Sequence, residues 1–120
     1  MFAIFKYWIL TIVLFLLLLS AGHAQDWEKI KSRGMMEFVV VAKEKEADEN
    51  VYLDAIKQIC TQGEYCRIMF WSNRDDVPMS WPMTDSQEKA MTADYFYNAN
   101  SDEMLLLWNC RLGKNPSQCF

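Results

Sequence analysis

Histidine is almost absent from this sequence of 120 residues. The single histidine, His23, lies in an N-terminal segment, residues 1–24, that has the features of an export signal. The rest of the chain therefore offers no imidazole, which excludes Ser-His-Asp and Cys-His nucleophilic machinery and any metal held by histidine. The sequence assigns no catalytic residue, and we expect the protein to bind no metal and no cofactor.

Basic clusters and glycine-rich loops are lacking as well. The chain carries 12 Lys and Arg residues against 16 Asp and Glu residues, a formal net charge of −4, and its basic residues are scattered. An acidic chain without a basic cluster argues against a nucleic-acid surface or an anionic-lipid surface. Gly34, Gly63 and Gly113 are isolated, so the sequence contains no glycine loop that could hold a phosphate. We therefore expect no nucleic-acid partner.

The first 24 residues carry the three parts of a signal peptide. Lys6 supplies a positive charge, residues 8–19 form an apolar run, and the small residues Gly22 and Ala24 stand at the −3 and −1 positions of a cleavage site. The apolar run is shorter than the roughly 20 residues that span a bilayer. The sequence therefore predicts cleavage after Ala24.

An uncleaved N-terminal anchor is the alternative, because the apolar run can be extended back past Lys6 to Phe2. We favour cleavage, which leaves one small globular domain at residues 25–120. This interpretation predicts a periplasmic or secreted protein with no stable membrane anchoring after the signal is removed.

All four cysteines lie in this domain, and an even number behind a signal peptide is typical of disulfides. The chain has no CxxC redox motif and no paired spacing of a zinc ribbon. Three pairings are possible. The expected topology favours the local pairs Cys60–Cys66 and Cys110–Cys119, whereas a mixed sheet could bring Cys66 beside Cys110.

Hydrophobic periodicity predicts three helices and three strands along the domain. Trp27 and Ile30 share a face of the first helix, and a capping box of Thr84 and Gln87 opens the last one. Outside the loop at residues 72–83, the tryptophans of the domain, Trp27, Trp71 and Trp108, are expected in the core. The helices are expected at residues 26–33, 50–60 and 84–97, and the strands at residues 36–42, 66–71 and 104–108.

The fold class expected from this order, (α)βαβαβ, is α/β or α+β. The strands are apolar at consecutive positions, which is typical of strands buried on both faces. Right-handed crossovers would make all three strands parallel and place both main helices on one face. We therefore expect a single small two-layer domain with a three-stranded sheet and helices mainly on one face. A mixed sheet with antiparallel neighbours is the competing topology.

The candidate binding site is the loop at residues 72–83, which contains Arg74, Asp75, Asp76, Met79 and Trp81. Trp and Arg are enriched at binding hot spots, and the prolines of this loop lower the entropy cost of presenting them. Trp81 could instead fold back as a lid over the sheet. Asp75 and Asp76 could serve acid–base chemistry or hold a lone Ca²⁺, but adjacent carboxylates on an extended backbone point apart, which is typical of a solvated turn.

Part of the chain resembles a group of small exported bacterial proteins. The resemblance spans about residues 39–110 and rests on Phe70-Trp71, Asp75, Pro78, Pro82-Met83-Thr84-Asp85, Ala90, Tyr95, Asn98 and Leu107-Trp108-Asn109-Cys110. The group has no established activity, so the resemblance implies a bacterial envelope or secreted location and assigns no catalytic residue. It also marks residues 72–84 as the distinctive part of the fold.

The function expected from these observations is that of a non-enzymatic, exported protein that binds another protein, as an inhibitor or an immunity protein does. Two alternatives remain at this point. One is a small hydrolase that uses carboxylates without histidine, such as Asp75 and Asp76. The other is a purely structural role in the cell envelope.

Overall fold

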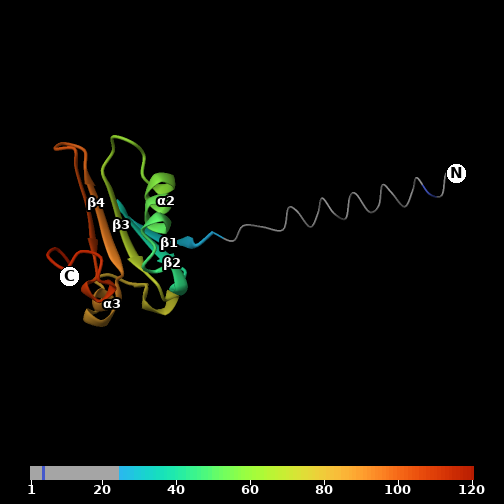
Figure 1. The fold of residues 1–120 in the computed structure, drawn as a ribbon. Coiled ribbons are helices and arrows are strands. Elements are labelled where there is room, and N and C mark those ends of the chain that lie inside the picture. Colours follow the sequence, from blue (N-terminus) through green and yellow to red (C-terminus); the bar gives the residue numbers. More distant parts are fainter. Residues whose placement is uncertain (1–3, 5–24) are drawn as a thin grey trace.

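The computed structural model describes residue 4 and residues 25–120, and it contains a five-stranded sheet (Figure 1). β2 and β3 are parallel, and the other neighbours are antiparallel. The expected three-stranded sheet of order (α)βαβαβ is therefore wrong, and the protein is an α+β domain with a mixed sheet. The strands lie side by side in chain order: β1 (Trp27–Arg33), β2 (Met36–Val41), β3 (Cys66–Trp71), β4 (Ala93–Asn98) and β5 (Glu103–Trp108).

Several predicted elements are confirmed. Thr84 and Gln87 form the predicted capping box at the start of α3 (Asp85–Ala90). The predicted signal peptide, residues 1–24, lies outside the described residues except for residue 4. Four elements lie within one residue of their predicted bounds: the helix at 50–60 and the strands at 36–42, 66–71 and 104–108.

The segment predicted as the first helix is strand β1. Trp27 and Ile30 are three residues apart, which suggested one helical face, but they pack on opposite faces of the sheet. The register between β1 and β2 shifts between Lys29 and Lys31, so the strand contains an irregularity of the β-bulge type. Gly34, with φ of +59°, then turns the chain into β2 rather than ending a helix.

The helix predicted at residues 84–97 ends at Ala90, and its second half is strand β4. Ala93, Tyr95 and Tyr97 recur every two residues and point to one face of the sheet, which is the period of a strand. The aromatic residues favour this pleated conformation. Two further strands, β1 and β4, thus join the three that the sequence predicted.

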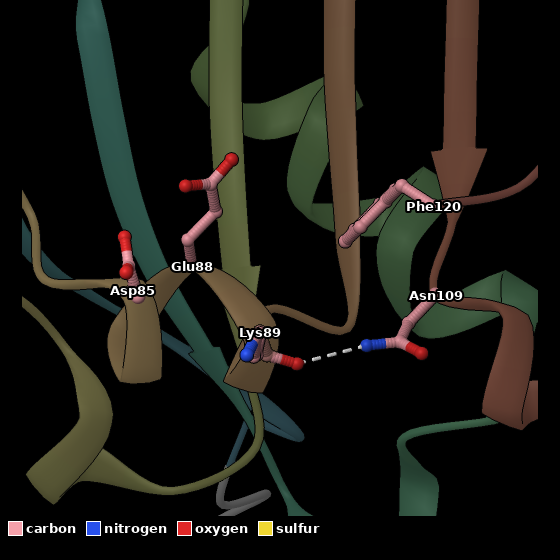
Figure 2. A pocket seen from close by; sticks show the side chains of 5 residues that line it. All are labelled: Asp85, Glu88, Lys89, Asn109 and Phe120. Carbon is pink, nitrogen blue, oxygen red and sulfur yellow. Dashed lines mark hydrogen bonds between the residues drawn. The ribbon is translucent and has the colours of Figure 1, made fainter.

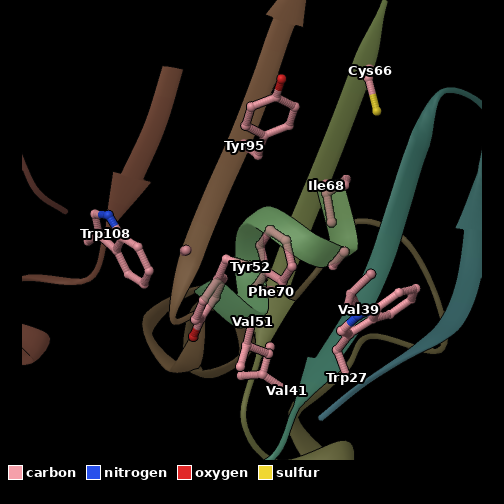
Figure 3. Packing of buried hydrophobic residues seen from close by; sticks show 12 residues of the cluster. Trp27, Val39, Val41, Val51, Tyr52, Cys66, Ile68, Phe70, Tyr95 and Trp108 are labelled. Atoms are coloured by element: carbon pink, nitrogen blue, oxygen red, sulfur yellow. The ribbon is translucent and has the colours of Figure 1, made fainter. Parts of the chain in front are cut away.

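One face of the sheet is covered by α2 (Glu49–Ile59), which connects β2 to β3. Tyr52 of this helix is fully buried, and its ring lies 4.7 Å from that of Phe70 and 4.5 Å from that of Trp108, measured between centroids (Figure 3). Its hydroxyl donates to the Glu46 carbonyl at 2.7 Å and lies 3.0 Å from the Thr92 hydroxyl, so the most polar atom of the ring has partners inside the fold.

The other face is covered by residues 72–92, which include α3. The Trp71 indole N–H donates to the carbonyl of Gln87 at 2.9 Å and fixes α3 against the sheet. The two helices therefore lie on opposite faces, and the prediction of helices mainly on one face is wrong. The buried cluster on this face consists of Phe38, Met69, Trp71, Val77 and Met91.

Both disulfides are local. Cys60–Cys66 joins the end of α2 to the start of β3, and Cys110–Cys119 holds the C-terminal segment beside β5. This is the pairing that the sequence favoured, although the sheet is mixed. Among residues 25–120, no helix is long and apolar enough to cross a membrane.

Candidate interaction surface

The predicted binding loop, residues 72–83, follows strand β1 along its length. The Arg74 guanidinium binds the carboxylate of Glu28 at 2.7 Å near the start of β1. Lys31, in the middle of β1, donates to the carbonyl of Met79 at 2.8 Å. At the end of the strand, the Arg33 guanidinium lies 5.6 Å from the centre of the Trp81 ring. Three side chains of one strand therefore hold this loop in place.

Trp81 folds back on the sheet and still remains partly exposed. Its ring stacks on the buried ring of Phe38, with centroids 6.1 Å apart and planes at 22°, so it forms a lid over the sheet. The Arg33 guanidinium covers the same indole. Even so, 37% of Trp81 remains exposed. The indole is thus fixed in one orientation and still accessible, which lowers the entropy cost of contacting a partner.

Two exposed methionines lie close in sequence to the residues of this contact, Met79 to Trp81 and Met35 to Arg33. Met79 is 74% exposed although its backbone is fixed by Lys31, and Met35, in the turn after Arg33, is 62% exposed. Methionine side chains adapt to irregular surfaces and are frequent at binding surfaces. We call these residues the Trp81 surface: Met35, Met79, Trp81, Lys31 and Arg33.

The other predicted site residues lie elsewhere on the loop. Arg74, Asp75 and Asp76 form a short 3-10 helix whose first turn is capped by the Asn73 side chain. Asp75 is exposed and Asp76 is partly buried. The structure therefore brings Met79 and Trp81 to one surface, while the two carboxylates belong to a separate turn.

Sequence reasoning missed Lys31 and Arg33 because residues 26–33 were interpreted as a helix. On a strand, Lys31 and Arg33 stand two residues apart, the spacing that places side chains on one face, whereas Lys29 lies before the bulge, opposite Val39, on the other face. That recurrence was the available signal. The bulge between Lys29 and Lys31 limits this recurrence to two residues, because the extra residue moves the odd-numbered positions to the other face.

A polar cluster centres on Glu46, just after β2. Arg111 binds its carboxylate through two nitrogens at 2.9 and 2.8 Å, Lys43 lies 3.3 Å away, and the Ser72 hydroxyl donates to it at 2.6 Å. The hydrogen bonds from Arg111 are the main reason that the pKa of Glu46 is lowered to about 2. The cluster connects the segments that follow β2, β3 and β5.

This cluster adjoins a cavity of about 560 Å³ that Lys43, Ser72, Arg74 and Arg111 help to line. A serine beside a carboxylate and a lysine suggests nucleophilic chemistry without histidine. However, a carboxylate with a pKa of about 2 is a very weak base and does not remove the proton of a serine hydroxyl near neutral pH. Glu46 therefore acts as an ion-pair clamp, which argues against the hydrolase alternative at this position.

A second cavity, of about 460 Å³, lies between α3 and the segments that follow β5. Figure 2 shows Asp85 and Glu88 on α3 at one side of it, and Asn109 and Phe120 at the other. The Asn109 amide donates to the carbonyls of Lys89 at 3.1 Å and Met91 at 2.8 Å. These hydrogen bonds anchor the end of α3, so the polar groups here serve the fold.

No family model, no curated protein and no solved structure matches this chain. Within residues 25–120, no group of three or more His, Cys, Asp or Glu residues is arranged to hold a metal ion. The function must therefore be inferred from the surface itself.

Proposed function

We propose that this protein is an exported, non-enzymatic domain that binds another protein through the Trp81 surface. The observation that carries the proposal is the half-exposed indole of Trp81, fixed between Phe38 and Arg33 beside the exposed Met79. Tryptophan and arginine are the residues most enriched at binding hot spots, and a fixed side chain loses little entropy when it binds.

The charges around Trp81 indicate the chemistry of the partner. Arg33 lies over the indole and Lys31 binds the Met79 carbonyl two residues before it, although the chain as a whole carries a net charge of −4. A complementary partner presents an apolar group flanked by carboxylates. An inhibitor or immunity protein that blocks an envelope enzyme is the kind of molecule that fits this description.

The location that we propose is the periplasm or the extracellular space. Two disulfides support it, because disulfides form and persist in oxidising compartments. The signal-like segment at residues 1–24 supports it independently.

The test is a comparison of two charge-introducing variants of the exported protein in a pull-down from envelope extracts. Met79→Glu changes a side chain that is 74% exposed on the Trp81 surface, and Leu53→Glu changes one that is 48% exposed on the outer side of α2. We expect Met79→Glu to lose the captured protein, with binding weakened by about 2 kcal/mol or more, because it places a carboxylate against an acidic partner.

Leu53→Glu is the matched control and should capture the same protein as the wild type. Both variants should unfold within about 0.5 kcal/mol of the wild type, as surface substitutions do. Equal capture by the two variants would reject the Trp81 surface as the binding site.

A further inference from the structure

Strand β5 is an edge strand with an open outer side. Its inner side pairs with β4 from Glu103 to Trp108, and on its outer side the described residues provide a single bridge, between Trp108 and Cys119. The free part of the edge therefore runs from Glu103 to Leu107. It carries no bulge, no proline and no charge after Glu103, although such features commonly protect an edge from pairing.

The hydrogen bonds at the end of β5 show which backbone groups are free. The carbonyl of Trp108 accepts from the N–H of Phe120, outside the sheet, and the N–H of Asn109 donates to Thr92, inside it. Because backbone groups alternate sides along an antiparallel strand, the N–H and C=O of Met104 and Leu106 point outward. The open edge thus offers two donors and two acceptors.

We propose that a second copy of this chain pairs with β5 in antiparallel orientation about a two-fold axis at Leu105. In this register Met104 of one copy faces Leu106 of the other, and each pair exchanges two N–H···O bonds. All four outward groups on each copy are then used. Leu105 faces its own counterpart at the closer, non-hydrogen-bonded spacing, where side chains contact most directly.

The apolar side chains of the edge suit this arrangement. Met104 is 69% exposed, and Leu105 and its neighbour on β4, Phe96, are each 39% exposed. Opposite residues in an antiparallel pair lie on the same face, so Met104 meets Leu106 on one face of the joined sheet and Leu105 meets Leu105 on the other. Glu103 faces Leu107, so the one charge of the strand does not face its own copy.

Charge complementarity favours a second copy over another apolar strand. In this register Glu103 of one copy faces Leu107 of the other, next to Trp108, whose outer side the C-terminal segment already occupies. The ammonium of Lys114 lies 5.7 Å from the centre of the Trp108 ring, and therefore beside the partner's acidic turn, Asp102 and Glu103. The two-fold axis forms this contact twice. Asp102 has φ of +59°, so the partner strand turns away where the C-terminal segment begins.

The experiment is sedimentation of the exported protein over a concentration series, with wild type and charge variants at the two-fold axis. We expect a reversible monomer–dimer equilibrium for the wild type. Leu105→Lys places like charges directly opposite each other and should raise the dimer Kd by about tenfold or more. Leu105→Glu should do the same. An equimolar mixture of the two variants should dimerise again, because lysine then faces glutamate.

A wild type that stays monomeric at every concentration overturns the proposal, and a mixture that fails to dimerise overturns the register centred on Leu105. Urea unfolding of each variant checks that the fold is intact.

If position 105 does not tolerate charge, Lys114→Glu provides the second test on an exposed side chain and should weaken the dimer several-fold. Lys29→Glu on the opposite edge is its matched control and should leave the Kd unchanged. Equal effects of these two variants also overturn the proposal.

Discussion

The two edges of the sheet are built differently. The β1 edge contains a bulge between Lys29 and Lys31, carries Arg33 at its end, and is followed along its length by the loop at residues 72–83. The β5 edge is regular and aliphatic from Met104 to Leu107, and among the described residues its outer side is bridged only at Trp108. Bulges and lysines are devices that keep an edge from pairing. The comparison indicates that β1 is protected against strand addition and that β5 is not.

The same difference separates the two proposed activities. The Trp81 surface lies over β1 and β2, and the proposed pairing edge lies at the other end of the strand order. A dimer formed through β5 would leave both Trp81 surfaces free. The protein could then present two binding surfaces to one partner or to neighbouring copies of it, which raises the apparent affinity without new contacts.

The largest expected effect is the difference in stability lost when a phenylalanine is removed from each of these two sides. Phe38 on β2 is 1% exposed between the rings of Trp71 and Trp81, whereas Phe96 on β4 is 39% exposed beside the open edge. We expect Phe38→Ala to lower the free energy of unfolding by about 3–5 kcal/mol. Phe96→Ala should cost about 1 kcal/mol, as a typical partly exposed substitution does. Equal losses in urea titrations would show that the two sides are buried alike and would break the comparison.

The disulfide between Cys110 and Cys119 limits the length of the open edge. Replacing both cysteines by serine should lower the free energy of unfolding by about 2–3 kcal/mol, because the unfolded chain gains freedom. The released segment would also expose the outer side of β5 at Trp108, so the variant should self-associate more than the wild type. A stability unchanged from the wild type in urea would contradict the structural role of this bond.

A smaller effect concerns the ion pair that connects the two halves of the sheet. Arg111, after β5, holds the pKa of Glu46, after β2, at about 2, below its ordinary 4.5. A lowered folded-state pKa contributes stability that is complete above the ordinary pKa and is lost as the pH falls toward 2. We expect Glu46→Gln to remove about 1–2 kcal/mol at pH 7 and less at pH 3, since solvent screens the half-exposed Arg111.

Thermal unfolding from pH 7 to pH 2 measures this dependence. Some of the loss at low pH should remain in Glu46→Gln, because the indole N–H of Trp27 also lowers the pKa of Asp54. The unfolding temperatures of the wild type and the variant should converge as the pH falls, because protonation of Glu46 removes its ion pair with Arg111 from the wild type. Parallel curves would show that the clamp contributes nothing that depends on the charge of Glu46.

Strong local signals made about half of the fold predictable from the sequence. The helix at residues 50–60 has a clear apolar stripe, and the strand at residues 66–71 is a continuous apolar run, so each pattern has one interpretation. The Thr84 capping box was also predictable, because it needs only residues three apart. The local disulfides were predictable because Cys60 and Cys66 lie at one end of the strands and Cys110 leaves the other end beside its own tail, and the sequence separations are 6 and 9 residues.

The remaining elements depend on tertiary context. Residues 27–33 form a strand because β2 provides the backbone partners, and the spacing of Trp27 and Ile30, which suggested a helix, places them on opposite faces of the sheet. At Ala93 to Tyr97 the alternating pattern was present, but the capping box upstream suggested that the helix continues. The exposure of Met79 and Trp81 was predictable, since apolar residues in a proline-containing loop have no strand or helix of their own to pack into. The positions of Lys31 and Arg33 beside this loop were not predictable, because they depend on residues 27–33 forming strand β1.

Amide hydrogen exchange at two protein concentrations tests the contrast between the edges most directly. At low concentration, the outward amides of Met104 and Leu106 should exchange fast, while those of Leu105 and Leu107 are protected by β4. At high concentration, Met104 and Leu106 should become protected, and the amides on the outer side of β1 should exchange as before. Exchange at Met104 and Leu106 that does not change with concentration would contradict the account, because the β5 edge would then be as unpaired as the β1 edge.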